Sequence, residues 1–352
     1  MSIIILLATI GLLLLLEKQW FKVSGSALDW SFSCDKTLVE PDAELCLTTK
    51  ISNRTGLPIP FIRLHQEIPS AGTVRQEIVR GQILRNSGSW WHIEERFSLR
   101  GRQYAEKTVS FSLPKRGAYK IGRGRITIGD LLGFQEQEFS LEPDMVVVMP
   151  ERSRNLKNLE AAGGFLGDIS VRRFIMEDPI MTVGFRDYSG REPMKSISWT
   201  RTAMTGTMQV KQFDYTSEKT AVVILNVRGA TGELLEESLR LTRSVCERLE
   251  KDKIPYSLRT NGNLPGPVGK LHRVPEGLGE SHLNTILYGL GRADSTCFYT
   301  FHSLVKQVMR SRKQNDAYIV ITPSLDQRDM AAINELRSLT GNPVCVLEVE
   351  MP

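Results

Sequence analysis

Residues 185–213 read FRDYSGREPMKSISWTRTAMTGTMQVKQF, and this stretch separates two parts of the chain with different patterns. Before it, short alternations of apolar and polar residues favour antiparallel strands. After it, apolar runs alternate with amphipathic segments, which is typical of a parallel sheet with crossover helices. Within it, Ile197 and Trp199 alternate with Ser196 and Ser198, and MQVKQF alternates again. We therefore expect a hairpin in which Trp199 packs against the following domain.

Length and composition are those of an ordinary globular protein. The 352 residues suit two modest domains, and 41% of them are hydrophobic and 24% charged. The net charge of +5 is spread along the chain, so we expect no nucleic-acid partner. The five cysteines form no CxxC pair, which favours reduced thiols. A Cys34–Cys46 bridge stays open if the first domain lies outside the cytoplasm.

The chain begins with an apolar segment. Residues 3–16 carry no charge, and extension through Val23 gives enough length for a membrane-spanning helix. A cleaved signal peptide is the rival interpretation, although a positively charged start is missing. Lys18 and Lys22 follow the apolar run, which places the bulk of the chain in the cytoplasm. We expect a transmembrane anchor over residues 1–23 of a single-pass cell-membrane protein.

Residues 24–150 contain the short alternations. LDWSFSC, ELCLTTKIS and WWHIEERFSL are examples, separated by Gly, Pro and Asn. This pattern predicts an antiparallel β-sandwich-like domain. GAYKIG and GRITIG surround Gly122 and Gly124, which could supply the positive φ of a tight hairpin.

Residues 219–352 predict an α/β domain with an open parallel sheet. TAVVILNV (220–227) is typical of a central strand covered on both faces, and residues 232–253 have a helical apolar face. The segments that follow are YSLRT, a turn at Asn261-Gly262, helices near 282–290 and 300–312, a strand at 317–322, another helix and the strand PVCVLEV. Between the two domains, residues 151–168 are basic and Gly-rich and predict an exposed linker, so residues 151–218 form a linker plus hairpin.

Two segments resemble the bacterial DUF58 family, and together with the apolar start the resemblance covers both domains and the anchor. FSLPKRGAYKIGRGRITIGDLLGFQE (111–136) is similar to the end of the family's β-domain, with a degraded Asp-Pro-Phe-Gly element. The family signature continues in the central stretch. Arg191 and Ser198 replace acids there, and Met204 stands where an arginine is common. The matching residues are Phe185, Arg186, Asp187, Tyr188, Ser189, Gly190, Lys195, Ile197, Trp199, Thr202, Ala203, Val210, Lys211, Gln212 and Phe213.

The resemblance implies a von Willebrand A-like last domain, a fold in which many members carry a metal-ion-dependent adhesion site. The first ligand motif of such a site, Asp-x-Ser-x-Ser, falls here on Asn226, Arg228 and Ala230. A hard Mg²⁺ ion requires oxygen ligands including a carboxylate, and Arg228 would place a cation at the metal position. The later strand ends at Thr322-Pro323-Ser324 without an acid. We expect a degenerate site, no bound metal and no cofactor.

The sequence predicts a protein that is not an enzyme. GxxxxGK[ST], GxGxxG, HExxH and GxSxG are all missing. The histidines occur at no ligand spacing, at His65, His92, His272, His282 and His302.

The DUF58 resemblance implies an interaction or scaffold role with a MoxR-type AAA+ ATPase. Their task would be the assembly or activation of a membrane or envelope complex, with other von Willebrand A proteins as further partners. The signature residues are either packing residues or a partner-binding surface. The second interpretation rests on the enrichment of Arg, Tyr and Trp at interfaces. The candidate partner-binding residues are Arg186, Tyr188, Gly190, Lys195 and Trp199.

Two other functions stay open. The α/β domain could bind an adhesion-type ligand through a divalent metal held by other residues, which a calorimetric Mg²⁺ titration tests. The chain could also be a hydrolase or transferase with an unrecognised site, which would need titratable groups clustered in one cleft.

Overall fold

The computed structural model describes residues 28–74, 82–130, 135–172, 178–190, 192–214, 220–266, 270–313 and 316–349, together with parts of 7–25. Contacts between Cα atoms divide the chain into two compact units, Met1–Glu151 and Arg152–Pro352. We call them unit 1 and unit 2 and describe each by itself.

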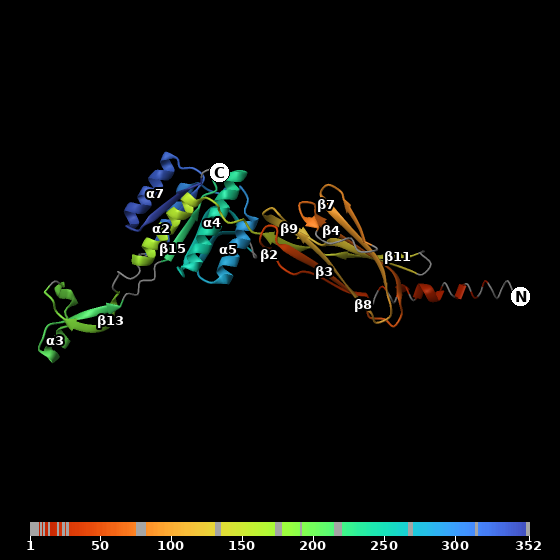
Figure 1. Cartoon of the computed structure of the whole chain (residues 1–352), viewed down its shortest axis with the longest axis horizontal. Helices are drawn as coiled ribbons and strands as arrows, with labels where there is room; N and C mark the ends of the chain where they lie inside the picture. The colour runs from red at the N-terminus through yellow and green to blue at the C-terminus, as the bar shows by residue number, and fades with distance from the viewer. Residues whose placement is uncertain are drawn as a thin grey trace. The chain divides into compact units, whose positions relative to one another are not determined.

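Unit 1 is an antiparallel β-sandwich-like arrangement, as the alternating pattern predicts (Figure 1). Its sheets have the orders β1-β3-β8-β5, β11-β10-β4-β7-β6 and β2-β12-β9, and among the strands described in this unit only β12 and β2 pair in parallel. The strands are β1 (Leu28–Cys34), β2 (Leu38–Val39), β3 (Glu44–Asn53), β4 (Ile59–Pro69), β5 (Thr73–Val74), β6 (Gln82–Asn86), β7 (Trp90–Leu99), β8 (Tyr104–Ser112), β9 (Gly117–Ile121), β10 (Arg123–Gly129), β11 (Glu136–Leu141) and β12 (Asp144–Val148).

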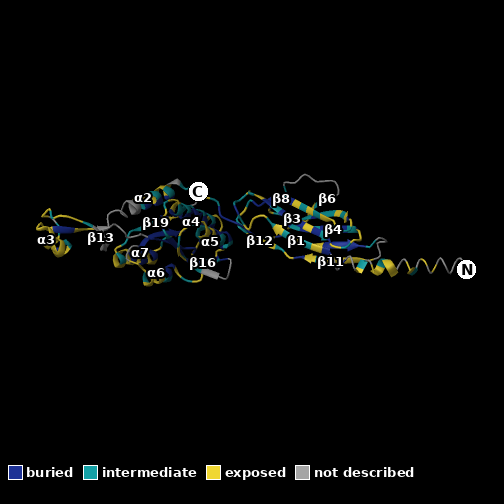
Figure 2. Cartoon of the chain, turned by 90° about the horizontal axis from the view of Figure 1, so that it is seen from below, coloured by how far each residue is buried: buried dark blue, intermediate teal, exposed yellow. Residues whose placement is uncertain are grey.

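The core of unit 1 follows the period of two residues along its strands (Figure 2). Leu45 and Leu47 on β3 share one apolar cluster with Ile68 on β4 and Phe111 on β8, so residues from different sheets meet there. One polar pair interrupts this interior. The buried Gln66 on β4 donates from Nε2 to Oγ1 of the buried Thr49 on β3, at 2.7 Å.

The predicted hairpin around Gly122 and Gly124 is wrong. β9 pairs with β12, whereas β10 pairs with β4 and β11, so the chain passes from one sheet to another at Gly122. Gly122 has φ of +77°, and a Cβ placed there would lie 1.7 Å from the Phe32 ring. The glycine therefore permits a crossing against an aromatic side chain.

The Cys34–Cys46 bridge, left open above, is not present: both thiols are free. Cys34 lies opposite Leu47 in the register of β1 and β3. Cys46 is the residue before Leu47 on β3, so its side chain points to the other face of the sheet.

Unit 2 is built on a mixed, mostly parallel sheet with the order β17-β16-β15-β18-β19, in which β17 is the antiparallel edge strand. The apolar cluster on one face joins Val222 and Ile224 of β15 to α6 and α7, and α4 and α5 cover the other face. The sheet and its helices are β15 (Thr220–Leu225), α4 (Glu233–Lys251), β16 (Tyr256–Pro265), β17 (Lys270–Gly277), α5 (Glu280–Arg292), α6 (Phe301–Arg310), β18 (Asp316–Thr322), α7 (Gln327–Thr340) and β19 (Val344–Glu348).

Two local predictions in unit 2 are wrong. Asn261-Gly262 is not a turn, because β16 continues through it and Asn261 is buried. The expected exposed linker contains α2 (Leu156–Arg172), which packs against α4 and β19. Ala162 and Leu166 are buried four residues apart on one face of α2. Tertiary packing thus outweighs the low helix propensity of its glycines.

The predicted anchor over residues 1–23 falls largely outside the described residues. Among the helices that can be described, none combines the length and the apolar character needed to cross a membrane.

We predict that Phe111→Ala lowers the free energy of unfolding of unit 1 by about 3–5 kcal/mol, because it empties a fully buried aromatic site. Denaturant titration followed by tryptophan fluorescence measures this, since Trp30, Trp90 and Trp91 all lie in unit 1. Tyr104→Ala is the matched control on the same strand, because Tyr104 is exposed, and it should change stability by less than about 0.5 kcal/mol. Equal effects of the two changes would contradict this core.

Candidate functional site

The signature stretch forms a two-stranded sheet of its own. β13 (Asp178–Asp187) pairs antiparallel with β14 (Gln209–Asp214), and Arg186 lies opposite Val210. The predicted strand in MQVKQF is thereby confirmed. Between the strands lie the 3-10 helix η1 (Met194–Ser196) and the helix α3 (Trp199–Thr205), and Figure 1 labels α3 next to β13.

The predicted strand alternation of Ile197 and Trp199 is wrong. Ile197 is buried and forms an isolated bridge with Val210. Trp199 begins α3, and the change from extended to helical backbone turns its ring out of the pleat. Its side chain is 59% exposed, so it contributes to the surface and does not provide the expected packing.

A charged loop orders the tip between β13 and η1. Glu192 accepts hydrogen bonds from the Ser189 hydroxyl at 2.8 Å and from the Ser189 backbone N–H at 3.1 Å. Its carboxylate also pairs with Arg186 Nη1 at 2.7 Å. The Ser189 hydroxyl, followed by the backbone N–H groups and Arg186, lowers the pKa of Glu192 to about 2. Gly190 makes the turn with φ of +86°.

The five predicted partner-binding residues lie on this one substructure. Arg186, Lys195, Trp199 and Gly190 are exposed, whereas Tyr188 is half-buried and donates its backbone N–H to Met208 O at 2.8 Å. Arg191, which replaces an acid of the DUF58 signature in the resemblance stated above, lies outside the described residues.

Large apolar side chains are unusually exposed on the same substructure. The Arg201 guanidinium lies 5.0 Å above the centroid of the Phe185 ring, a cation–π contact at the surface. Met204 is 75% exposed. We call the following residues the hairpin surface: Phe185, Arg186, Met194, Trp199, Arg201, Met204 and Met208.

The carboxyl edge of the unit 2 sheet holds a buried amide network at the predicted degenerate metal site. Asn226 follows β15, and its Nδ2 donates to Thr322 Oγ1 at the end of β18, at 3.0 Å. Its Oδ1 accepts from Asn261 Nδ2 at 2.8 Å and from the Arg228 backbone N–H at 3.0 Å. Asn261 Oδ1 in turn accepts from the Val227 N–H at 3.0 Å.

Arg228 and Ala230 have different roles at this edge. Ala230 is buried, whereas Arg228 is half exposed with Nη1 3.9 Å from Asp326 Oδ2. Asp326 also caps α7 by accepting the Asp329 N–H at 2.7 Å. Burial, followed by the Asp326 charge, raises the pKa of Asp329. Sequence reasoning sought an acid directly after β18 and missed Asp326, which the turn after the strand brings beside Arg228.

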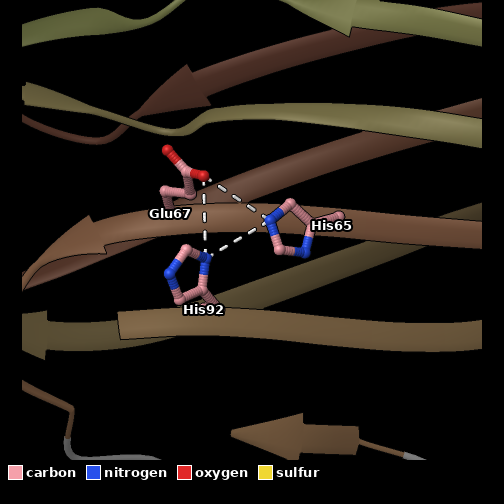
Figure 3. A group of neighbouring side chains, drawn as sticks. All are labelled: His65, Glu67 and His92. Carbon is pink, nitrogen blue, oxygen red and sulfur yellow. Dashed lines mark hydrogen bonds and ion pairs between the residues drawn. The ribbon is translucent and has the colours of Figure 1, made fainter. Parts of the chain in front are cut away.

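Another cluster was missed in unit 1, where His65 and Glu67 on β4 meet His92 on β7 (Figure 3). His65 Nε2 and His92 Nδ1 are 3.4 Å apart, and each is 3.6 Å from Glu67 Oε1. The pairing of β4 with β7 places Glu67 opposite His92, so the statement that the histidines have no ligand spacing is wrong for this pair. Burial, then Arg125 and His92, lowers the pKa of His65. The one sequence signal was His-x-Glu within a strand.

Comparison with known proteins gives no family. No family model matches the chain, and no curated protein matches it. A non-cellulosomal cohesin from Archaeoglobus fulgidus is 13% identical, with a TM-score of 0.23, over 34% of this chain and 91% of that one. A type II cohesin from Acetivibrio cellulolyticus is 12% identical (TM-score 0.23; 34% and 95%). The chitin-binding domain of Chi18aC from Streptomyces coelicolor is 12% identical (TM-score 0.21; 28% and 90%). These scores are too low to transfer a binding activity to this chain.

We predict that Ser189→Ala raises the pKa of Glu192 from about 2 towards its ordinary 4.5. The depressed pKa means that this contact stabilises the loop above pH 4.5, and that the stabilisation is lost as the pH falls through about 2. At pH 3.5, NMR of the side-chain carboxyl should show Glu192 ionised in the wild type and partly protonated in the variant. Ser196→Ala in the same segment is the control. An unchanged titration in Ser189→Ala would disprove the assigned cause.

We predict that Asn226→Ala lowers the free energy of unfolding of unit 2 by about 1–3 kcal/mol, because it removes the buried hydrogen bonds that the Asn226 amide makes with Thr322 Oγ1 and Asn261 Nδ2. Helical circular dichroism during denaturation reports this, since the helices α2 to α7 belong to unit 2. Arg228→Ala, which breaks only the half-exposed ion pair, should cost less than about 1 kcal/mol. A larger loss in Arg228→Ala than in Asn226→Ala would reverse the assignment.

Proposed function

We propose that this protein is a non-enzymatic, membrane-anchored interaction or scaffold protein that works with a MoxR-type AAA+ ATPase. Their joint task would be the assembly or activation of a membrane or envelope complex. The observation that carries the proposal is the hairpin surface, where exposed aromatic, methionine and arginine side chains gather on one small substructure.

The composition of the hairpin surface is suited to protein recognition. Trp and Arg are enriched among residues that dominate binding energy, and flexible methionines adapt to the shape of a partner. Trp199 and Met204 lie on α3, Met194 on η1 and Phe185 on β13, so separate elements contribute to it. Exposed apolar side chains that gather in this way mark interaction sites on soluble surfaces.

The charged loop supports the same role by fixing Arg186. The Glu192 carboxylate holds one guanidinium nitrogen, and it is itself held by two donors of Ser189. Less side-chain entropy is then lost when a partner binds Arg186, which favours affinity. Among the signature residues, Arg186 and Trp199 are the two we assign to direct contact, and Gly190 to the turn that presents them.

The α/β unit supports a scaffold role without a metal at its carboxyl edge, where ligands bind in such folds. In the von Willebrand A-like interpretation, Asn226 and Arg228 occupy metal-ligand positions. Here the amide of Asn226 is engaged by neighbouring strands, and the Arg228 guanidinium faces Asp326. A cation fixed beside that carboxylate opposes the entry of Mg²⁺.

The remaining parts of the proposal rest on the apolar start of the sequence and on the DUF58 resemblance. Residues 1–23 anchor the chain in the cell membrane, with the bulk in the cytoplasm where an AAA+ ATPase and other von Willebrand A proteins would meet it. Unit 1 serves as a spacer or binding module between the anchor and unit 2. Nucleic acid is not a partner in this proposal.

The proposal is tested by a crosslinked pull-down from native membranes, with identification of the captured proteins by mass spectrometry. Wild type should capture an AAA+ ATPase of the MoxR type. Trp199→Ala and Arg186→Ala should each lose at least about 10-fold of it, the loss expected of a central contact worth about 1.4 kcal/mol or more. Tyr188→Ala should lose less, because Tyr188 is half-buried beside the strand pair.

Tyr104→Ala is the matched control, since it removes an exposed aromatic side chain from unit 1. It should leave capture unchanged. If Trp199→Ala and Arg186→Ala also retain the ATPase at wild-type levels, the hairpin surface is not its binding site. If wild type captures no AAA+ ATPase, the partner itself is wrong.

A further inference from the structure

The cluster of His65, Glu67 and His92 already has the spacing of a metal site. Its three facing atoms are separated by 3.4, 3.6 and 3.6 Å. A tetrahedral Zn²⁺ ion with bonds of about 2.0–2.1 Å holds its nitrogen and oxygen ligands about 3.3–3.4 Å from one another. The atoms would therefore have to move by only a few tenths of an ångström to bind one ion.

The two strands hold the cluster rigidly. His65 and Glu67 are alternate residues of β4 and share a face, because the buried Gln66 between them points into the interior. His92 on β7 lies directly opposite Glu67 in the register. Side chains that start from paired strands are placed more precisely than side chains on loops.

Outer contacts orient two of the three groups, as the outer partners of metal ligands usually do. Ser87 Oγ lies 2.8 Å from His92 Nε2, and it can accept the proton of that nitrogen. The lone pair of a neutral His92 then lies on Nδ1, the atom that faces Glu67. Arg123 Nε is 4.0 Å from Glu67 Oε2, which leaves Oε1 turned toward both imidazoles (Figure 3).

We propose that His65 Nε2, His92 Nδ1 and Glu67 Oε1 bind one Zn²⁺ ion, with the fourth position open to solvent. Two imidazole nitrogens favour Zn²⁺ over Mg²⁺ or Ca²⁺, which prefer oxygen ligands. The three side chains are only 18–28% exposed, so one side of the site faces solvent and can admit water or a donor atom of a ligand. The ion would tie β4 to β7 and so stabilise unit 1. This site departs from the sequence-based expectation that the chain binds no metal.

The test is calorimetric titration of Zn²⁺ into the full-length protein after removal of metal with a chelator. Wild type should bind one Zn²⁺ per chain and show a higher Tm for unit 1. Ser87→Ala should weaken binding by about 10-fold, as expected for an outer partner. His92→Ala and Glu67→Gln should weaken it more, because each removes a ligand. Circular dichroism verifies that every variant is folded.

His302→Ala on α6 and Cys34→Ser in unit 1 are the controls, because they remove other side chains that can bind zinc. Both should bind Zn²⁺ as wild type does. X-ray absorption of the zinc-loaded wild type should show nitrogen and oxygen neighbours, which keeps the test independent of variants. Absence of binding to the wild type, unchanged affinity in His92→Ala and Glu67→Gln, or a sulfur neighbour would each overturn the proposal.

Discussion

The side chain of Asn226 joins three strands at the carboxyl edge of the unit 2 sheet, and the arrangement of that edge depends on it. Parallel strands end side by side, so the loops that leave them crowd buried polar groups together. The one amide of Asn226 makes hydrogen bonds with Thr322 at the end of β18 and with Asn261 on β16. A carboxylate could not donate to Thr322 in this way. The amide thus gives the edge a neutral, internally bonded form, and the ion pair of Arg228 and Asp326 lies beside it.

The hairpin of β13 and β14 differs from this sheet because it exposes much of its apolar surface. The apolar side chains that the structure describes there lie largely at the surface. The order of the hairpin comes from backbone pairing, from the buried Ile197 and from the Glu192 contacts at the tip. In unit 2 the same chain therefore combines a sheet that buries its apolar residues with a substructure that presents them. In the proposed function, the first supplies stability and the second supplies recognition.

Periodicity alone predicts most elements but not how they meet. Strands in unit 1 and the β and α segments after residue 219 have clear periods of two and of 3.6 residues, and they form as expected. The helix α2 was not predicted because its glycines resemble a linker. It forms because it packs on α4. Gly122 resembled a hairpin glycine, although the Phe32 ring is the reason for it. His65 and His92 are 27 residues apart, and only the register of β4 with β7 brings them together.

The hydrogen bond between Gln66 and Thr49 also determines which residues unit 1 presents to solvent. Gln66 separates His65 from Glu67, and its partner lies on a strand of the facing sheet. A slip of β4 by one residue would bury an imidazole and a carboxylate and expose apolar neighbours. It would also leave Thr49 unsatisfied in the interior. The inward-facing amide of Gln66 thus helps to fix the register of β4. The register in turn determines that His65 and Glu67 lie on the outer face of the sandwich.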